Sequence, residues 1–268
     1  MDLSPDKRKD QHFLTDQAVL DRIIEAASIS PNEVVLEIGA GPGNMTRLLS
    51  SKARHVYAIE LDRRFTEALQ FEYRNSTNVT IIPGNALKVD FPRFDKAVAN
   101  LPYSISSGVT FRLLQYPFHL AILMYQREFA QRMAAKTGEE DYSRLSVTVQ
   151  HFADVQPLFN VSRRAFTPQP EVESTVVRLT PRPASYHLND EDLFMKLVTA
   201  AFSGRRKKLR KAILNGADMI GRGDLHAIVA ALPHDILEKR AEQVSPEEFA
   251  LLANEMEMMK YGYPNLSR

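Results

Sequence analysis

Short apolar runs alternate with amphipathic stretches through the first two thirds of the chain. The apolar runs are rich in Val, Ile and Leu and have the length of strands; they are Val34–Ile38, His55–Glu60, Val79–Ile82, Ala97–Asn100 and His119–Met124. Helical patterns lie between them, at Asn44–Ala53, Arg63–Phe71 and Ser106–Leu114. Strands that alternate with helices favour βαβ units, and continuous apolar strands are typical of parallel sheets covered on both faces. The pattern therefore predicts an α/β fold.

The pattern changes in the last third of the chain. Three further runs are strand-like without helices between them and predict an antiparallel extension at one sheet edge: Val147–Phe152, Val155–Val161 and Ser174–Leu179. The prolines of Pro181–Pro183 disfavour helix before them and mark a break. Only helical patterns follow, at Asp190–Phe202, Lys207–Ile213, Leu225–Leu232, Asp235–Arg240 and Pro246–Lys260. We expect a first domain over residues 1–183 and a helical domain over residues 184–268.

A glycine-rich segment follows the first predicted strand and precedes a helix. It runs Gly39-Ala40-Gly41-Pro42-Gly43. Glycine permits tight turns and close approach of the backbone to a ligand. The dinucleotide fingerprint Gly-x-Gly-x-x-Gly would need glycine where the chain has Asn44. The spacing Gly-x-Gly-x-Gly instead resembles that of class I S-adenosylmethionine methyltransferases, whose ligand carries no pyrophosphate.

Two polar residues at the ends of the next predicted strands are candidates for ligand contacts. Glu60 ends the second strand, 21 residues after Gly39, where an acid can accept hydrogen bonds from both hydroxyls of a ribose. Asn85 follows the third strand, and ligands of such sheets lie outside the carboxyl ends of the strands. Asn85 is therefore a candidate to meet the adenine amino group of a cofactor. A turn asparagine is an equally good interpretation of this residue taken alone.

The tetrapeptide Asn100-Leu101-Pro102-Tyr103 closes the fourth predicted strand at the same edge. An adenine amine is a poor nucleophile, and two acceptors on its N–H bonds would pull it toward tetrahedral geometry. The side-chain oxygen of Asn100 and the carbonyl of Leu101 are candidates for these acceptors, and Pro102 fixes the turn. Tyr103 can stack on the base, which is worth about 1–3 kcal/mol. The tetrapeptide is thus predicted to promote transfer of a methyl group to the adenine amine. It would do so by positioning and electrostatics, without a metal or a covalent intermediate.

Six segments in order, spanning nearly the whole chain, resemble the KsgA-type rRNA adenine dimethyltransferases, with the archaeal and eukaryotic branch included. They are Gln11–Leu14, Val35–Gly43, Glu60–Asp62, Asn100–Tyr103, Ala165–Pro170 and Phe202–Arg210. The resemblance implies a Rossmann-like class I S-adenosylmethionine methyltransferase sheet and a smaller all-helical C-terminal domain that binds rRNA. It implies methyl transfer from S-adenosylmethionine to N6 of two adjacent adenosines in the 3′-terminal hairpin loop of small-subunit (16S) rRNA. The substrate would be a pre-ribosomal particle during ribosome biogenesis.

The resemblance also implies roles for individual residues. The residues expected to bind the cofactor are His12, Leu14, Gly39, Gly41, Glu60, Asn85 and Asn100. Phe166 would stack on the target base opposite Tyr103. The chain departs from the family pattern in having Asn85 where Asp is usual, His12 where Asn is frequent, and Asp10 where Gly commonly precedes the glutamine. Asn85 would keep an acceptor oxygen for the adenine amine but lose the charge.

Basic residues are concentrated in three places, although the formal net charge is only +1. Smaller clusters are Lys7–Lys9 and Arg163–Arg164, and the largest consists of Arg205, Arg206, Lys207, Lys208, Arg210 and Lys211. A charge run is usually a solvated face, but beside a base-methylating site it favours contacts with RNA phosphates. The target adenine would have to leave its stack, which costs less in a loop than in a duplex. We therefore expect these clusters to bind rRNA.

The composition sets the broad class of protein. With 268 residues, 44% hydrophobic and 25% charged, the chain is typical of a globular protein of one large domain or two. The absence of cysteine excludes disulfides, thiolate metal sites and a cysteine nucleophile, and the histidines lack metal-ligand spacing. No apolar run of about 18 residues and no secretory signal are present. The expectation is a cytoplasmic monomer without metal, membrane or DNA partners.

Three alternative functions use related motifs. A large-subunit rRNA adenine methyltransferase would share the catalytic segments, but Phe202–Arg210 and the long helical tail favour the small-subunit enzyme. A non-catalytic assembly factor of the same fold would not require the intact glycines and Asn100. A protein glutamine or DNA adenine methylase uses an Asn-Pro-x-Tyr-like motif, which Leu101 and the segment Gln11–Leu14 disfavour.

Overall fold

The computed structural model of the chain describes residues 4, 11–221 and 224–259. The described residues divide into two compact units. The first comprises the residues up to Ala130 together with Ala153–Pro181, and the second comprises Gln131–Phe152 and the residues from Arg182 onward. The basic cluster Lys7–Lys9 lies outside the described residues.

The first unit is built on a seven-stranded sheet of order β4-β3-β2-β5-β6-β9-β7. Its strands are β2 (Val34–Ile38), β3 (His55–Glu60), β4 (Val79–Pro83), β5 (Lys96–Asn100), β6 (Leu120–Gln126), β7 (Ala153–Val161) and β9 (Ser174–Pro181). Neighbours among β2 to β6 pair in parallel, whereas β9 pairs antiparallel with both β6 and β7. The predicted α/β sheet with an antiparallel extension at one edge is therefore confirmed.

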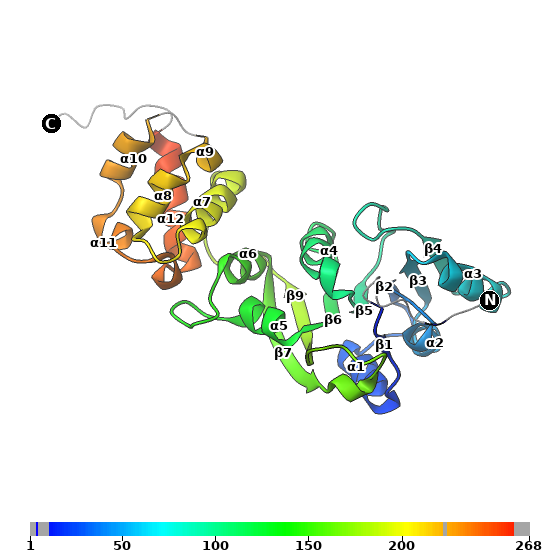
Figure 1. The fold of residues 1–268 in the computed structure, drawn as a ribbon. Helices are drawn as coiled ribbons and strands as arrows, with labels where there is room; N and C mark the ends of the chain where they lie inside the picture. Colours follow the sequence, from blue (N-terminus) through cyan, green and yellow to red (C-terminus); the bar gives the residue numbers. More distant parts are fainter. Residues whose placement is uncertain (1–3, 5–10, 222–223, 260–268) are drawn as a thin grey trace. The chain divides into compact units, whose positions relative to one another are not determined.

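Helices cover both faces of this sheet. They are α1 (Gln17–Ala27), α2 (Asn44–Ser50), α3 (Arg63–Glu72), α4 (Ser106–Leu113) and α5 (Arg127–Ala134), the last of which crosses the boundary between the units. Figure 1 shows α1 and α4 on opposite sides of the strands β5 and β6. All five residues of β2 are buried, because a central parallel strand is covered on both sides.

The chain order of the strands reverses beside β2. The chain runs outward from β2 through β3 to β4 and then returns to place β5 on the other side of β2. The connections leaving the carboxyl ends of β2 and β5 therefore diverge, and such a switch point opens a crevice for ligands. The glycine-rich segment follows β2, and the tetrapeptide beginning at Asn100 follows β5. The topology thus brings both predicted motifs to one crevice.

A two-stranded sheet anchors the beginning of the described chain. Strand β1 (Phe13–Leu14) pairs antiparallel with β8 (Phe166–Thr167), with Leu14 opposite Phe166. Next to this pair, the backbone N–H of Thr15 donates to the carbonyl of Ala165 over 2.9 Å. The segment before α1 is therefore held against residues about 150 positions later in the chain.

One predicted strand is wrong. The residues Val147–Phe152 belong to helix α6 (Arg144–Phe152). The β-branched run of Val147 to Val149 favours strand locally, but packing overrides this propensity. Val147 is fully buried in the core of the second unit, and the side-chain amide of Gln150 donates to the carbonyls of Met133 and Ala135 over 2.8 and 2.9 Å.

The second unit consists of helices around one apolar core. They are α6, α7 (Glu191–Ser203), α8 (Leu209–Asn215), α9 (Ala217–Ile220), α10 (Leu225–Ala231), α11 (His234–Leu237) and α12 (Pro246–Met258). The core brings Tyr142 and Val147 together with Phe194 and Phe249. The predicted boundary at residue 184 therefore needs correction: residues 131–152 belong to this unit, because their apolar side chains complete its core. None of the described helices is long and apolar enough to cross a membrane.

The contact of Tyr142 with Val244 tests the assignment of residues 131–152 to the second unit. The buried hydroxyl of Tyr142 donates to the carbonyl of Val244 over 3.0 Å, just before α12. We expect Tyr142→Phe to lower the free energy of opening of the second unit by about 1–2 kcal/mol, because the carbonyl loses its donor. Native-state hydrogen exchange of the α12 amides would measure the change. Tyr57→Phe, at a half-buried ring of β3, is the control, and equal effects of both variants would contradict the assignment.

Candidate active site

A cavity of about 260 Å³ opens at the carboxyl edge of the parallel strands. It brings together nine of the residues predicted from sequence. These are His12, Gly39, Gly41, Glu60, Asn85, Asn100, Leu101, Pro102 and Tyr103. They come from segments that follow β2, β3, β4 and β5 and from the segment that contains β1. The motifs therefore line a single pocket at the switch point of the sheet.

The glycine-rich segment is shaped for close approach. Gly39 and Gly41 have φ angles of 79° and 52°, in the left-handed region that favours glycine. A β-carbon at Gly39 would lie 3.6 Å from the carbonyl oxygen of Asn100 and from a ring carbon of Pro102. The segment after β2 thus lies within van der Waals reach of the tetrapeptide after β5, and the two form one wall of the cavity.

Glu60 links this segment to β3. One carboxylate oxygen accepts the N–H of Gly41 over 2.7 Å, and the other accepts the N–H of Asp62 over 2.8 Å. Burial raises the pKa of Glu60, and these backbone donors oppose part of that rise. Each oxygen retains further lone-pair capacity toward the cavity. Glu60 can therefore hold the glycine loop in place and accept hydrogen bonds from a ligand.

A second carboxyl group lies behind the loop. Glu37 is 2% exposed, and burial raises its pKa to about 8. It lines a small cavity of about 30 Å³ that also touches Asn44 and Asn100. Burial therefore favours the neutral, protonated form of Glu37 behind the glycine loop.

The orientation of the Asn100 amide is set by its surroundings. Its nitrogen donates to the carbonyl of His12 over 3.0 Å, and a carbonyl can only accept. The amide oxygen then has no hydrogen-bond partner among the described residues. The side chain consequently offers an acceptor, which is the property predicted for this position.

Tyr103 is held at the same wall by its hydroxyl group. The hydroxyl lies 2.7 Å from the hydroxyl of Ser174 on β9, and the ring is half-buried. The imidazole of His12 faces it, with ring centroids 6.2 Å apart and planes inclined by 23°. His12 is tied in turn to the carbonyl of Pro168 over 2.9 Å. The cavity therefore has an aromatic side suited to a flat ring.

Phe166 and Leu14 lie outside the main cavity in this structure. Phe166 is 2% exposed and Leu14 is 4% exposed, and neither lines the main cavity. Their pairing across β1 and β8 places both in the core of the first unit. In this structure Phe166 presents no open ring face to a base. Leu14 instead touches the small cavity behind the loop, where its carbonyl accepts the Asn44 amide over 2.9 Å.

Sequence reasoning missed a network at the rim of the cavity. Asp62 is 5% exposed, caps α3, and accepts hydrogen bonds from the side chains of Gln11 and Arg64 over 2.9 and 2.8 Å. Both Gln11 and Asp62 line the cavity. An acid that directly precedes a helix is a capping signal visible in the sequence, but its link to Gln11 depends on the fold.

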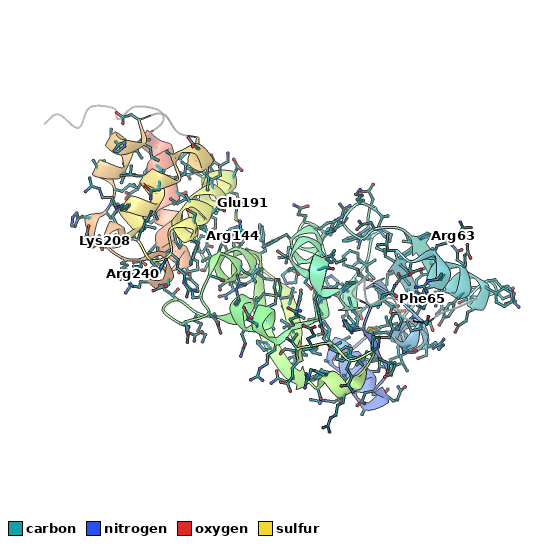
Figure 2. The ribbon with its side chains drawn as sticks, viewed as in Figure 1. Arg63, Phe65, Arg144, Glu191, Lys208 and Arg240 are labelled. Carbon is teal, nitrogen blue, oxygen red and sulfur yellow. The ribbon has the colours of Figure 1, made fainter. Side chains whose placement is uncertain are left out.

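The predicted RNA-binding cations differ in how they are paired. Arg205 is paired with Glu242 over 3.0 Å, and Lys208 is paired with Glu238. Figure 2 shows Lys208 beside Arg240, with which it forms a β-bridge. In contrast, no ion pair links the exposed side chains of Arg206, Lys207, Arg210 and Lys211 to any described residue. In the first unit, Arg163 and Arg164 are exposed on the turn before Phe166, where Arg163 donates to the carbonyl of Glu171.

Comparison with known families gives one match over most of the chain. The model of the family described as ribosomal RNA adenine dimethylase matches residues 5–256. A protein of Methanosarcina acetivorans named probable ribosomal RNA small subunit methyltransferase A is 52% identical over 245 residues, which cover 91% of each chain. A protein of the same name from Halobacterium salinarum is 47% identical over 93% of this chain and 89% of its own length.

Solved structures agree with this similarity. A dimethyladenosine transferase from Plasmodium falciparum has a TM-score of 0.78 and 34% identity, covering 90% of this chain and 96% of its own. The 23S rRNA methyltransferase ErmE has a TM-score of 0.68 and 27% identity, covering 91% and 99%. The predicted Rossmann-like methyltransferase fold is confirmed by these neighbours together with the parallel sheet.

The buried carboxyl of Glu37 predicts a pH dependence of stability. Because its pKa is about 8 in the folded chain and 4.5 for an ordinary glutamate in water, its contribution is complete below pH 4.5 and is lost as pH rises toward 8. Glu37→Gln keeps the shape of the neutral group but does not titrate. The free energy of unfolding of this variant, relative to that of the wild type, should therefore rise between pH 4.5 and 8. Urea denaturation at a series of pH values measures this change. Glu25→Gln, at an exposed position of α1, should show no such trend, and a flat difference for Glu37→Gln would refute the assignment.

Proposed function

Because the chain belongs to the ribosomal RNA adenine dimethylase family, we propose that it dimethylates N6 of two adjacent adenosines in the 3′-terminal hairpin loop of small-subunit rRNA. The observation that carries the proposal is the Asn100 amide, whose oxygen is left as an acceptor at the ligand edge of the sheet. Its methyl donor is S-adenosylmethionine. The substrate implies action where small subunits are assembled, in the cytoplasm.

The residues of the cavity fit this donor. Gly39 and Gly41 line the cavity, and Glu60 has acceptor capacity for ribose hydroxyls beside them. Apolar side chains of Ile38, Ile59 and Leu61 offer surface to a purine. When bound, S-adenosylmethionine supplies a methyl group activated on a sulfonium. The residues that would hold this donor are Gly39, Gly41, Glu60 and Asn85.

The remaining chemistry is positioning of the target amine. The Asn100 oxygen and the Leu101 carbonyl accept the two N–H bonds and direct the nitrogen lone pair toward the methyl group. Preorganised acceptors of this kind stabilise the developing charge in the transition state. Tyr103 supports the base by stacking, worth about 1–3 kcal/mol. Since Phe166 is buried in the core, the ring of His12 is the better-placed second face for the base.

The two units have separate tasks in this proposal. The first unit carries out methyl transfer, and the helical unit binds rRNA through the exposed cations Arg206, Lys207, Arg210 and Lys211. Arg205 and Lys208 pair with acids of their own unit, so they chiefly shape the basic segment. Arg163 and Arg164 add phosphate contacts beside the catalytic cavity. The enzyme acts as a monomer on a pre-ribosomal particle.

The likeness to ErmE keeps a large-subunit substrate as the second candidate. The family match and the identity of about half to proteins named small subunit methyltransferase A favour the small subunit. Methylation assays on each purified ribosomal subunit from a strain lacking the enzyme separate the two. Transfer confined to the large subunit would overturn the proposed substrate.

Removal of the Asn100 side chain tests the catalytic role. We expect Asn100→Ala to reduce turnover at saturating cofactor about 100-fold to 1,000-fold, because one preorganised acceptor is lost. Transfer of labelled methyl groups to small subunits gives the rate, and circular dichroism checks the fold. Asn215→Ala, at an exposed helix end, is the matched control. Near-normal turnover of Asn100→Ala would end the catalytic assignment.

Removal of unpaired cations tests the RNA surface. We expect Arg206→Ala combined with Lys207→Ala to weaken rRNA binding and to flatten its dependence on log salt by about 1.4–1.8, since each phosphate contact contributes about 0.7–0.9. Binding titrations over a range of salt concentrations measure this slope. The control pair Lys52→Ala and Arg54→Ala removes the same charge from exposed positions before β3. Equal slopes for the two double variants would show only a general charge effect and refute the proposed contacts.

A further inference from the structure

The side chain of Asn85 presents the opposite group to that of Asn100. Its oxygen accepts the backbone N–H of Leu87 over 2.9 Å. A backbone N–H can only donate, so the atom that meets it must be the amide oxygen. The amide nitrogen then has no hydrogen-bond partner among the described residues, while Asn85 lines the main cavity. The cavity therefore meets a donor at this position.

The backbone around Asn85 holds this orientation. Its carbonyl accepts the N–H groups of Lys88 and Val89 over 2.8 and 2.9 Å, and the N–H of Gly84 donates to the carbonyl of Glu60 over 2.8 Å. Rotation of the amide would leave the Leu87 N–H facing an NH₂ group, so that this N–H would lose its acceptor. The side chain is thus locked as a donor toward the cavity.

We infer that Asn85 donates a hydrogen bond to an acceptor on the purine of the cofactor and does not select the exocyclic amine. The sequence predicted an acceptor for that amine, but the oxygen points to the N–H of Leu87, so the NH₂ group is the other end of the amide. An amine opposite an amide NH₂ would pair two donors, as would N1 of a 6-oxo purine, which carries a hydrogen, whereas N7 of either purine or a 6-oxo group can accept. The inference rests on the proposed use of S-adenosylmethionine. It makes Asn85 a specificity-determining residue with weak discrimination between 6-amino and 6-oxo purines.

Calorimetry with two product analogues tests the inference without turnover. S-adenosylhomocysteine carries the 6-amino group, and S-inosylhomocysteine carries the 6-oxo group. We expect the wild-type chain to bind the two within about threefold. Asn85→Asp replaces the donor by a charged acceptor of the same shape and should widen the preference for S-adenosylhomocysteine by about tenfold or more, because a hydrogen bond to a charged group is stronger than one between neutral groups. Asn32→Asp, at an exposed turn before β2, should leave the ratio unchanged.

Three other calorimetric results would contradict the inference. A wild-type preference for S-adenosylhomocysteine above about 30-fold would show that Asn85 does not donate to an acceptor shared by the two purines, since sites built to bind a polar group strongly reject ligands that lack it. An unchanged ratio in Asn85→Asp would show that this residue does not meet the purine. If neither analogue binds the folded wild-type chain, the proposed cofactor is wrong, and the inference fails with it.

Discussion

The hydrogen bonds of the Glu60 carboxylate are the constraint on which the site depends. They join the loop after β2 to the end of β3 and to the start of α3. Burial disfavours the charged form of this carboxyl group, and the backbone donors that it positions offset part of that cost. A loop with glycines at positive φ has little stiffness of its own. Its shape is maintained by this contact and by the tetrapeptide that lies against Gly39.

Two asparagines at the same cavity show how backbone groups determine side-chain chemistry. The side-chain nitrogen of Asn100 donates to the carbonyl of His12, and the side-chain oxygen of Asn85 accepts from the N–H of Leu87. The first therefore faces the cavity with an acceptor and the second with a donor. The residue type is the same in both cases, and the difference arises only from the direction of a neighbouring peptide group.

The basic residues of the helical unit also differ in their partners. Arg205 and Lys208 are paired with acids of their own unit, and exposed pairs of this kind add little to stability. Their positive charge is therefore partly compensated. The cations that can bind RNA phosphates without first breaking an ion pair to a described residue are Arg206, Lys207, Arg210 and Lys211. The number of basic residues in a run thus overestimates its capacity to bind RNA, because the acids that pair with them are 37 and 30 positions away in the chain.

The sequence by itself determined the alternation of β2 to β6 with helices and the placement of the glycine loop, Glu60 and Asn100 at strand ends. These follow from periodicity and turn chemistry, which are local properties. Tertiary structure alone decided that Val147–Phe152 is helical, that Phe166 lies in the core, and which atom of Asn85 faces the cavity. Each of those outcomes depends on a partner distant in the chain or on the direction of one peptide group. Propensity and spacing carry no information about either, because burial and hydrogen-bond direction arise only once the strands and helices are packed.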